Sequence, residues 1–508
     1  MPNRHYFRVM RKEPSQADGS VLLSSGPVAG AAAGQADPTV ALPAIGTLER
    51  RFSVPRPHVA VGRLAGRLAL GALLLAMLAV VAFAATGPSV LVPRSALSFP
   101  NWDAGPLHGL FGRPIDQPLT LSIGLSVVIV AMLAAYGIAL AAVRSLSMRT
   151  IVIFVVAAHA ILLLGPPLQL TDLFNYLGYA RLGGLHHLNP YTHVMAGEVH
   201  DPVYRFTSWH SLRSPYGPLF TVLSYPLAFL PLPVAYWVLK IVTVLTSLAF
   251  VWLVWKCARL LGRDSRFVVL FVAANPIYLI YAVAGFHNDF FMLVPAIGAI
   301  ALLLARRDRS AGAVLMAAVA VKFSAVLLLP FLLIAVRPTE RRLRILVGAA
   351  IGAIPLALLS LAFFGFSIPN LVDQSTLLTD FSIPNVAGDL LGLGGGTPAL
   401  LRVANVALVV AVIYLLRRRR EWLVGAGWAT LALIASLAWL VPWYVIWLLP
   451  LAGLGTSVRL RRATLALTLY LVIGFMPVTG WLLSQHSINL MSGPAGQGSK
   501  ALQQRLAG

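Results

Sequence analysis

Charged residues are scarce in this sequence. Only 11% of its 508 residues are Asp, Glu, Lys or Arg, whereas 58% are hydrophobic. A water-soluble domain of this size needs more charge to cover its surface. Apolar runs of about 17–23 residues recur along the chain, which is the length needed to cross the hydrocarbon core of a bilayer. The sequence therefore predicts an all-α, polytopic membrane protein.

Cysteine and acidic residues are also few. Cys257 is the single cysteine, which excludes a disulfide framework. The 17 acidic residues face 39 Lys and Arg, so the net charge is +22. Such an excess could indicate nucleic-acid binding, but the basic clusters flank the apolar runs on the side that the positive-inside rule assigns to the cytoplasm. We therefore expect no nucleic-acid partner, a multi-pass protein of the plasma membrane and a cytoplasmic N-terminus.

The expected domain organisation follows from composition. Residues 1–62 are polar and rich in Gly, Pro and Ser, without an apolar core near Met1, and predict a disordered cytoplasmic tail. Residues 63–485 are expected to form the transmembrane domain, with a long outer loop at 169–233. Residues 486–508 are expected to be a flexible extracytoplasmic end.

Two stretches interrupt the pattern of spans. Residues 216–233 are short and rich in Pro, and predict a helix in the outer leaflet. Residues 310–336 lie between two basic clusters and must turn back within the membrane, with Lys322 near the turn. Counting this re-entrant pair as two, we expect about thirteen membrane helices. The other expected spans are 64–86, 119–143, 150–168, 234–256, 267–285, 290–305, 345–366, 399–416, 421–438, 441–456 and 463–483.

The first polar stretch of interest, "TDLFNYLGYARLGG", follows a span at the outer side. Asp172, Asn175, Tyr176 and Tyr179 recur at helical spacing, which predicts one face of an amphipathic helix at the membrane surface. Such a stripe suits a sugar, whose rings stack on Tyr and whose hydroxyls need acceptors. The alternative is that Thr171 or Asp172 merely caps the helix.

The second stretch is "HND", which joins two expected spans at the outer surface. His287, Asn288 and Asp289 could form only a polar turn, or Asn288 and Asp289 could hydrogen-bond a sugar or orient a catalytic group. A second carboxylate at ligand spacing is lacking, and the histidines of the outer loop have no metal-site spacing. We therefore expect no metal site.

Lys322 and an aromatic cluster complete the candidates. A lysine in a re-entrant turn is costly unless it pairs with an anion, either a carboxylate or a lipid phosphate. The alternative is that its side chain reaches to the interface. The stretch "AWLVPWYVIW" places Trp443 and Tyr444 at an outer span end, where aromatic residues anchor proteins or recognise ligands.

Together these features resemble the GT-C glycosyltransferases. More narrowly, "TDLFNYLGYARLGGLHHLNPY", "SPYGPL", "NPIYLIYAVAGFHNDFFM", "AVKFSAVLLLP" and "PWYVIWLLP" resemble the actinobacterial polyprenyl-phosphomannose-dependent α-1,6-mannosyltransferases of lipomannan synthesis, the MptA/MptB group. The resemblance extends over residues 60–485 and implies a GT-C fold with outer-face juxtamembrane helices.

The resemblance implies an inverting transfer of mannose from polyprenyl-phosphate-mannose to an α-1,6-mannan (lipomannan-type) acceptor outside the membrane. Asp172 would take the proton from the acceptor hydroxyl. Lys322, or else Arg213 or Arg181, would stabilise the lipid phosphate. The donor is a diester with one negative charge, so we expect neither a cofactor nor a metal ion. The expected substrate-binding residues are Asn175, Tyr176, Tyr179, Asn189, Tyr191, Tyr216, His287, Asn288, Asp289, Trp443 and Tyr444.

Two alternatives stay open on the sequence. The transferred sugar could be arabinose, glucose or galactose, because epimers differ only in the direction of a hydroxyl. A transporter of lipid-linked sugars would be expected to show internal repeats and charged segments near mid-membrane. The chain has no repeat that we can see, and its acidic residues gather at one face, which favours an enzyme.

Overall fold

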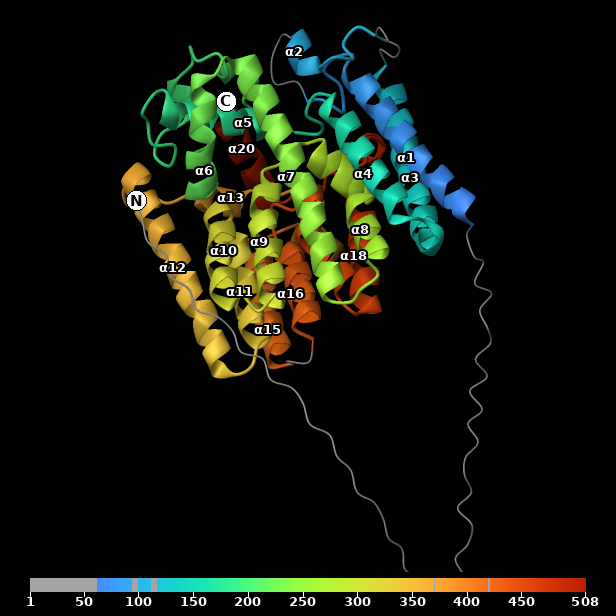
Figure 1. Ribbon diagram of the computed structural model, residues 1–508. Helices are drawn as coiled ribbons and strands as arrows, with labels where there is room; N and C mark the ends of the chain where they lie inside the picture. The colour runs from blue at the N-terminus through green and yellow to red at the C-terminus, as the bar shows by residue number, and fades with distance from the viewer. Residues whose placement is uncertain (1–61, 94–98, 111–116, 171, 370, 419–420) are drawn as a thin grey trace, which may run out of the picture. The chain divides into compact units, whose positions relative to one another are not determined.

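The computed structural model describes residues 62–93, 99–110, 117–170, 172–369, 371–418 and 421–508. Every regular element in these residues is a helix (Figure 1). Helices are expected because backbone N–H and C=O groups in a bilayer must be paired within the segment. The predicted tail 1–62 lies outside the described residues, apart from Gly62.

The first long helices match expected spans. Helices α1 (Arg63–Ala84) and α4 (Met148–Leu163) pack together, and α3 (Pro118–Ala141) packs on α1. Pro118 opens α3, where its missing N–H costs no hydrogen bond. Ser147 caps α4 by accepting a hydrogen bond from the Thr150 N–H. A short helix, α2 (Asn101–Ala104), comes between α1 and α3 in the sequence.

The segment after α4, which the sequence predicts to be an outer loop, folds into a helical layer at one end of the long helices (Figure 1). It contains α5 (Asp172–Gly184), α6 (Pro218–Ser224) and η4 (Tyr225–Phe229), and leads into α7 (Leu232–Leu260). The prediction of an amphipathic helix at the membrane surface is wrong for α5. Its residues from 173 to 180 are all buried, because α6, η4 and α7 pack around it.

The next segment holds the "HND" turn. The expected span 267–285 is bent by 52° between α8 (Ser265–Ala273) and the π-helix η5 (Ile277–Val283). Asn275 accepts a hydrogen bond from the Ile277 N–H at this break. The turn follows η5, and α9 (Asp289–Leu304) begins at its last residue.

The predicted re-entrant segment is present. Helix α10 (Asp308–Val321) ends at Lys322, whose backbone is extended, and the chain continues through η6 (Phe323–Leu327) and α11 (Leu328–Ile334). Arg341 at the start of α12 (Thr339–Phe364) pairs with Asp308 at the start of α10, at 2.7 Å. The segment therefore returns to the level at which it began, with Lys322 at its tip.

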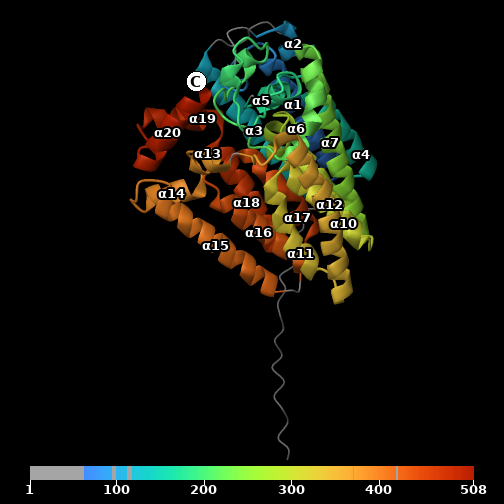
Figure 2. The ribbon, with the colours of Figure 1, turned by 90° about the vertical axis from the view of Figure 1, so that its left-hand side faces the viewer.

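Of the remaining helices, those formed by residues 339–364, 398–417 and 422–436 pack against this segment (Figure 2). Helices α18 and α19 form a second bent pair, with an angle of 58°. The elements are α12 (Thr339–Phe364), α13 (Leu371–Thr376), α14 (Ile383–Leu390), α15 (Pro398–Arg417), α16 (Trp422–Ser436), η8 (Pro442–Tyr444), α17 (Val445–Leu454), α18 (Val458–Gly474), α19 (Pro477–Gln485) and α20 (Pro494–Ala507). Residues 494–507 are thus helical, whereas the sequence predicts a flexible segment there.

Among the described residues, five helices are long and apolar enough to cross a membrane, or up to seven if each bent pair is one span. Shorter apolar helices, such as α4, α9 and α16, lie at other expected spans. The chain is therefore a polytopic, all-helical membrane protein. The count of thirteen helices and the GT-C fold stay predictions.

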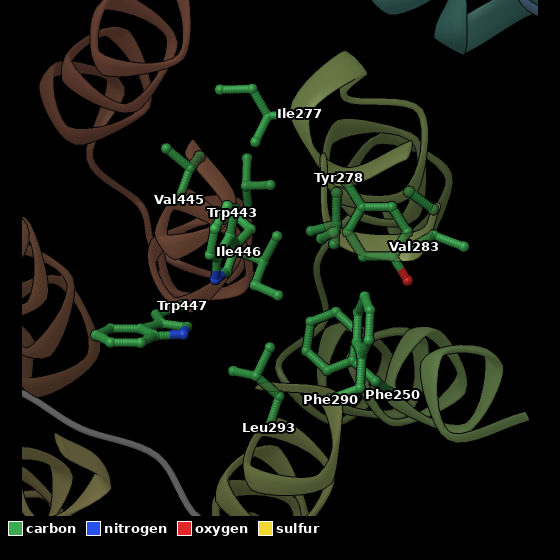
Figure 3. Packing of buried hydrophobic residues seen from close by; sticks show 14 of the residues in the cluster. Phe250, Ile277, Tyr278, Val283, Phe290, Leu293, Trp443, Val445, Ile446 and Trp447 are labelled. Atoms are coloured by element: carbon green, nitrogen blue, oxygen red, sulfur yellow. The ribbon is translucent and has the colours of Figure 1, made fainter. Parts of the chain in front are cut away.

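A buried aromatic cluster supports the "HND" turn (Figure 3). Tyr278 of η5 stacks on Phe250 of α7 at 6.2 Å and meets Phe290 of α9 edge-on at 5.6 Å. The Trp447 ring of α17 lies apart from these three rings in the same view (Figure 3). Large rings contribute both apolar burial and preferred ring geometry, so the packing of Tyr278, Phe250 and Phe290 fixes the turn between η5 and α9 relative to α7.

Candidate active site

A cavity of about 700 Å³, part of it open to solvent, lies where α5, the "HND" turn and the tip of the re-entrant segment meet. Its charged and amide side chains are Asp172, Asn288, Asp289 and Lys322, which we call the polar wall. Aromatic and aliphatic residues line the rest.

Helix α5 presents Asp172, Tyr176 and Tyr179 to the cavity. The Tyr179 hydroxyl donates to the Leu212 carbonyl at 2.9 Å, and the Tyr176 hydroxyl accepts from the Asn288 N–H at 3.3 Å. Burial, and then the nearby Asp172 carboxylate, raises the pKa of both tyrosines well above its usual range. Both hydroxyls are therefore protonated and neutral.

Asn175, also predicted to bind substrate, turns away from the cavity. Its side-chain oxygen accepts hydrogen bonds from the backbone N–H groups of Ser208 and Trp209, at 3.1 and 3.3 Å. Its spacing places it on the flank of the Asp172–Tyr176–Tyr179 face, where the following loop covers it. Asn175 therefore holds the loop that carries Trp209.

His287 lies behind Asp172 and is fully buried. Its ring stacks on Trp443 at 3.8 Å, and its Nδ1 is 3.5 Å from an Asp172 carboxylate oxygen. A side chain at Gly285 would collide with the Tyr281 carbonyl and with the His287 ring, so the turn requires glycine there. His287 was predicted to bind substrate, but it contacts Asp172 instead and is in a position to orient it.

Lys322 reaches the cavity from the tip of the re-entrant segment. Its Nζ is 2.8 Å from an Asp289 carboxylate oxygen, which also accepts a 2.6 Å hydrogen bond from the Trp447 indole N–H. The ammonium lies 4.9 Å from the ring centres of Tyr444 and Trp447. The expectation of an anionic partner is confirmed, and that partner is a protein carboxylate. Because an ammonium has three N–H donors, it can still bind a second anion.

The two predicted arginines do not line the cavity. Arg181 binds Asp201 at 2.8 Å and also donates to the Ala228 carbonyl. Burial alone would raise the pKa of Asp201, but hydrogen bonds from His186 and Arg181 outweigh it and lower that pKa. Arg181 is thus part of the outer loop's own ion pair, and Arg213 is exposed.

Three further candidates hold the loop. Asn189 donates from its side chain to the Phe364 carbonyl at 3.0 Å and accepts from the Tyr191 N–H. The Tyr191 hydroxyl donates to the Tyr216 carbonyl at 2.8 Å. Of these three, only the Tyr216 ring lines the cavity, together with the predicted Trp443 and Tyr444.

Six lining residues were not among the candidates from sequence. Two are Leu170 and Pro215, and the other four, which we call the apolar wall, are Trp209, Leu212, Leu377 and Trp439. The rings of Trp209 and Trp439 meet edge to face, with centres 6.1 Å apart. Trp439 belongs to the stretch "AWLVPWYVIW", which could equally anchor the protein at the interface. Leu377 had no distinguishing sequence feature.

Comparison of the sequence with known proteins identifies the family of this chain. Residues 60–338, more than half of the chain, match the family described as "Alpha-(1->6)-mannopyranosyltransferase, N-terminal domain". The chain belongs to this family of glycosyltransferases. The matched segment includes every residue of the polar wall.

Two curated relatives agree with this membership. This chain is 27% identical over 360 residues to alpha-(1->6)-mannopyranosyltransferase A of Mycobacterium tuberculosis. The match covers 62% of this chain and 67% of that protein. The chain is 25% identical over 367 residues to a probable alpha-(1->6)-mannopyranosyltransferase of Mycolicibacterium smegmatis, covering 61% and 66%. The match thus spans about two thirds of each relative. No solved structure matches the chain.

The described residues of this mannosyltransferase contain no group of three His, Cys, Asp or Glu side chains placed to hold a metal ion. Lys322 and the carboxylates of the polar wall are the charged groups that the cavity offers to a substrate. Metal independence stays a prediction.

Proposed function

We propose that this mannosyltransferase moves mannose, with inversion, from polyprenyl-phosphate-mannose to an α-1,6-mannan acceptor at the outer face of the plasma membrane. The observation that carries the proposal is the pairing, in one cavity, of a partly exposed carboxylate with a lysine beside an apolar groove. The carboxylate suits an attacking hydroxyl, the lysine suits a phosphate, and the groove suits a lipid.

Asp172 is the better of the two cavity carboxylates to act as the base. Asp289 is 1% exposed and already accepts hydrogen bonds from Lys322 and Trp447. The Asp172 side chain is 15% exposed, and one of its carboxylate oxygens lies 3.5 Å from the His287 Nδ1 without a hydrogen bond between them. Asp172 would take the proton of the acceptor 6-hydroxyl as its oxygen attacks the anomeric carbon. A positioned base contributes about 10²–10⁴-fold to the rate.

Lys322 is the cation that remains for the donor, since Arg181 and Arg213 do not line the cavity. As the sugar–phosphate bond breaks, the phosphate gains negative charge, and a fixed ammonium stabilises that charge in the transition state. The ion pair with Asp289 holds the ammonium in place, and its remaining N–H groups can donate to phosphate oxygens.

An apolar groove of about 400 Å³ adjoins this lysine. It runs along α9 and α16, past the returning half of the re-entrant segment, and is lined by residues such as Leu293, Leu328 and Leu433. Trp447 lines the groove and donates to Asp289, the partner of Lys322. We assign the groove to the first part of the polyprenyl chain, because its phosphate end would then reach Lys322.

The distribution of charge supports the proposed side of the membrane for the cavity. Helix α9 begins at Asp289 in the cavity and ends at Leu304, about 24 Å away at 1.5 Å per residue. Arg306, Arg307 and Arg309 follow directly after it. The positive-inside rule assigns that end to the cytoplasm, which supports an extracytoplasmic cavity.

The test uses membranes that contain the protein, labelled polyprenyl-phosphate-mannose and a short α-1,6-mannoside. We expect extension of the mannoside by wild type and its loss in Asp172→Ala. Glu198→Gln is the matched control, because it removes an outer-loop carboxylate that does not line the cavity. Transfer from a nucleotide sugar without any lipid donor would overturn the donor assignment. Cysteine labelling that places position 172 on the cytoplasmic side would overturn the orientation.

A further inference from the structure

The apolar wall is assembled from three segments that are far apart in the sequence. Trp209 and Leu212 belong to the loop after α5, Leu377 follows α13, and Trp439 follows α16. Both indoles are only partly buried and line the cavity. The four residues carry no charge. They offer a neutral surface, partly aromatic and partly aliphatic, to whatever enters the cavity.

Helix α20 holds these segments together. Leu506 packs against Leu212 and Leu377 in a small hydrophobic cluster, and Trp209 and Trp439 pack on the same cluster. The contacts are reinforced at the backbone. The Ser211 N–H donates to the Leu506 carbonyl at 2.9 Å, next to Leu212.

A second link lies beside Leu377. The Leu378 N–H donates to the Ser499 hydroxyl at 2.7 Å, and Ser499 is buried in α20. Figure 2 shows α20 beside α13 and above α14. One helix thus fixes both aliphatic residues of the wall through their neighbours in the chain.

The apolar wall and the proposed donor groove are separate. Among the described residues they have no lining residue in common, and the groove contacts the polar wall through Trp447. If the lipid donor occupies the groove and Lys322, the acceptor must use another part of the cavity. The apolar wall has the chemistry for it, because the C–H faces of a pyranose stack on aromatic rings.

We propose that Trp209 and Trp439 form the binding subsite for a neutral acceptor sugar, and that α20 is the element that positions them. The inference rests on the proposed transferase function and adds the residues that select the acceptor. Leu377, Trp439 and α20 all lie outside the segment 60–338 that defines the family match. The absence of charge in the wall makes the acceptor a neutral saccharide, and not an anionic one.

The kinetic test measures the KM for the acceptor and the KM for the donor separately. We expect Trp439→Ala and Trp209→Ala each to raise the KM for the mannoside about 10-fold, with the donor KM and kcat within about two-fold of wild type, because uniform binding is lost. Trp439→Phe keeps a ring and should retain most of the acceptor affinity. An unchanged acceptor KM, or an equal rise in donor KM, would overturn the subsite.

The role of α20 is tested with Leu506→Ala. We expect the acceptor KM to rise about three-fold while kcat stays near wild type, since the indoles are displaced and the polar wall is not. Gln504→Ala, an exposed position on the same helix, is the control. A fall in kcat with an unchanged acceptor KM would contradict a positioning role. If the tryptophan-to-alanine variants fail to accumulate, Trp439→Phe and Leu506→Ala carry the test.

A binding measurement separates this inference from the proposed function. Saturation-transfer NMR on Asp172→Asn protein, without donor, reports whether an α-1,6-mannoside binds. We expect binding, and its loss when Trp439→Ala is added. Mannoside binding that persists in the double variant overturns the subsite alone. Full transfer activity in Asp172→Asn overturns the catalytic proposal and leaves the binding result standing.

Discussion

The polar wall and the apolar wall of the cavity are built in different ways. All residues of the polar wall lie between Asp172 and Lys322, and each stands at a helix end or a helix break. The apolar wall combines positions 209, 212, 377 and 439 and depends on α20. The comparison teaches that the reacting groups stand at helix ends that the local sequence sets, although Trp447 of α17 also holds Asp289. The neutral surface has no such local origin and depends on long-range packing. Substitutions in the polar wall and in the apolar wall should therefore change different kinetic constants.

The largest expected effect is on the polar wall. Asp172→Asn should lower kcat about 10³-fold, because the base is lost while the size of the side chain is kept. The acceptor KM should stay near wild type, since the apolar wall is untouched. Initial rates at varied mannoside concentration measure both constants. Activity of Asp172→Asn near wild type would end the base assignment.

Lys322→Met is the next test. It removes the ammonium but keeps the length of the side chain, so we expect kcat to fall about 10²-fold and the donor KM to rise, because the phosphate loses its charged donor. Lys322→Arg should recover part of the activity. A rise in acceptor KM alone would show that Lys322 acts on the other substrate and would break the separation of the walls.

A substitution at His287 tests a residue that contacts the base without lining the cavity. His287→Gln should lower kcat about 10-fold through poorer orientation of Asp172, with little change in either KM. Trp443→Phe retains a ring for His287 to stack on and serves as the milder variant. The same kinetic assay reads the result, and a selective rise in acceptor KM would place His287 in direct substrate contact.

The smallest effect is expected from metal removal. Because Lys322 is assigned to the single negative charge of the donor phosphate, EDTA should change the transfer rate less than about two-fold. Membranes treated with EDTA, with and without added Mg²⁺, provide the measurement. A strong loss that Mg²⁺ restores would mean that the polar wall needs a bound cation in addition to Lys322.

Much of the polar wall could be predicted from the sequence. The stretch from Asp172 to Gly184 forms one helix, as its spacing and final glycines indicate. The chain reverses at Lys322, as the flanking basic clusters require. These features depend on neighbours in the chain, so a single sequence is enough to reveal them.

The errors have physical causes of another kind. Arg181 was a candidate for the phosphate, but Asp201, twenty residues on, pairs with it. Asn175 is at helical spacing from Asp172, yet the loop around Ser208 covers it and uses its side-chain oxygen. The contact of Leu377 with Leu506 depends on tertiary packing, which no local spacing indicates.

The ion pair of Asp308 with Arg341 has a further consequence for the substrate. It fixes the base of the re-entrant segment, and α10 rises 14 residues, or about 21 Å, from that base to Lys322. Under the proposed function, the length of one helix would thus set the distance from this base at which Lys322 meets the donor phosphate. Adding a turn to α10 would move the charge by about 5.4 Å and leave a donor of unchanged length out of register.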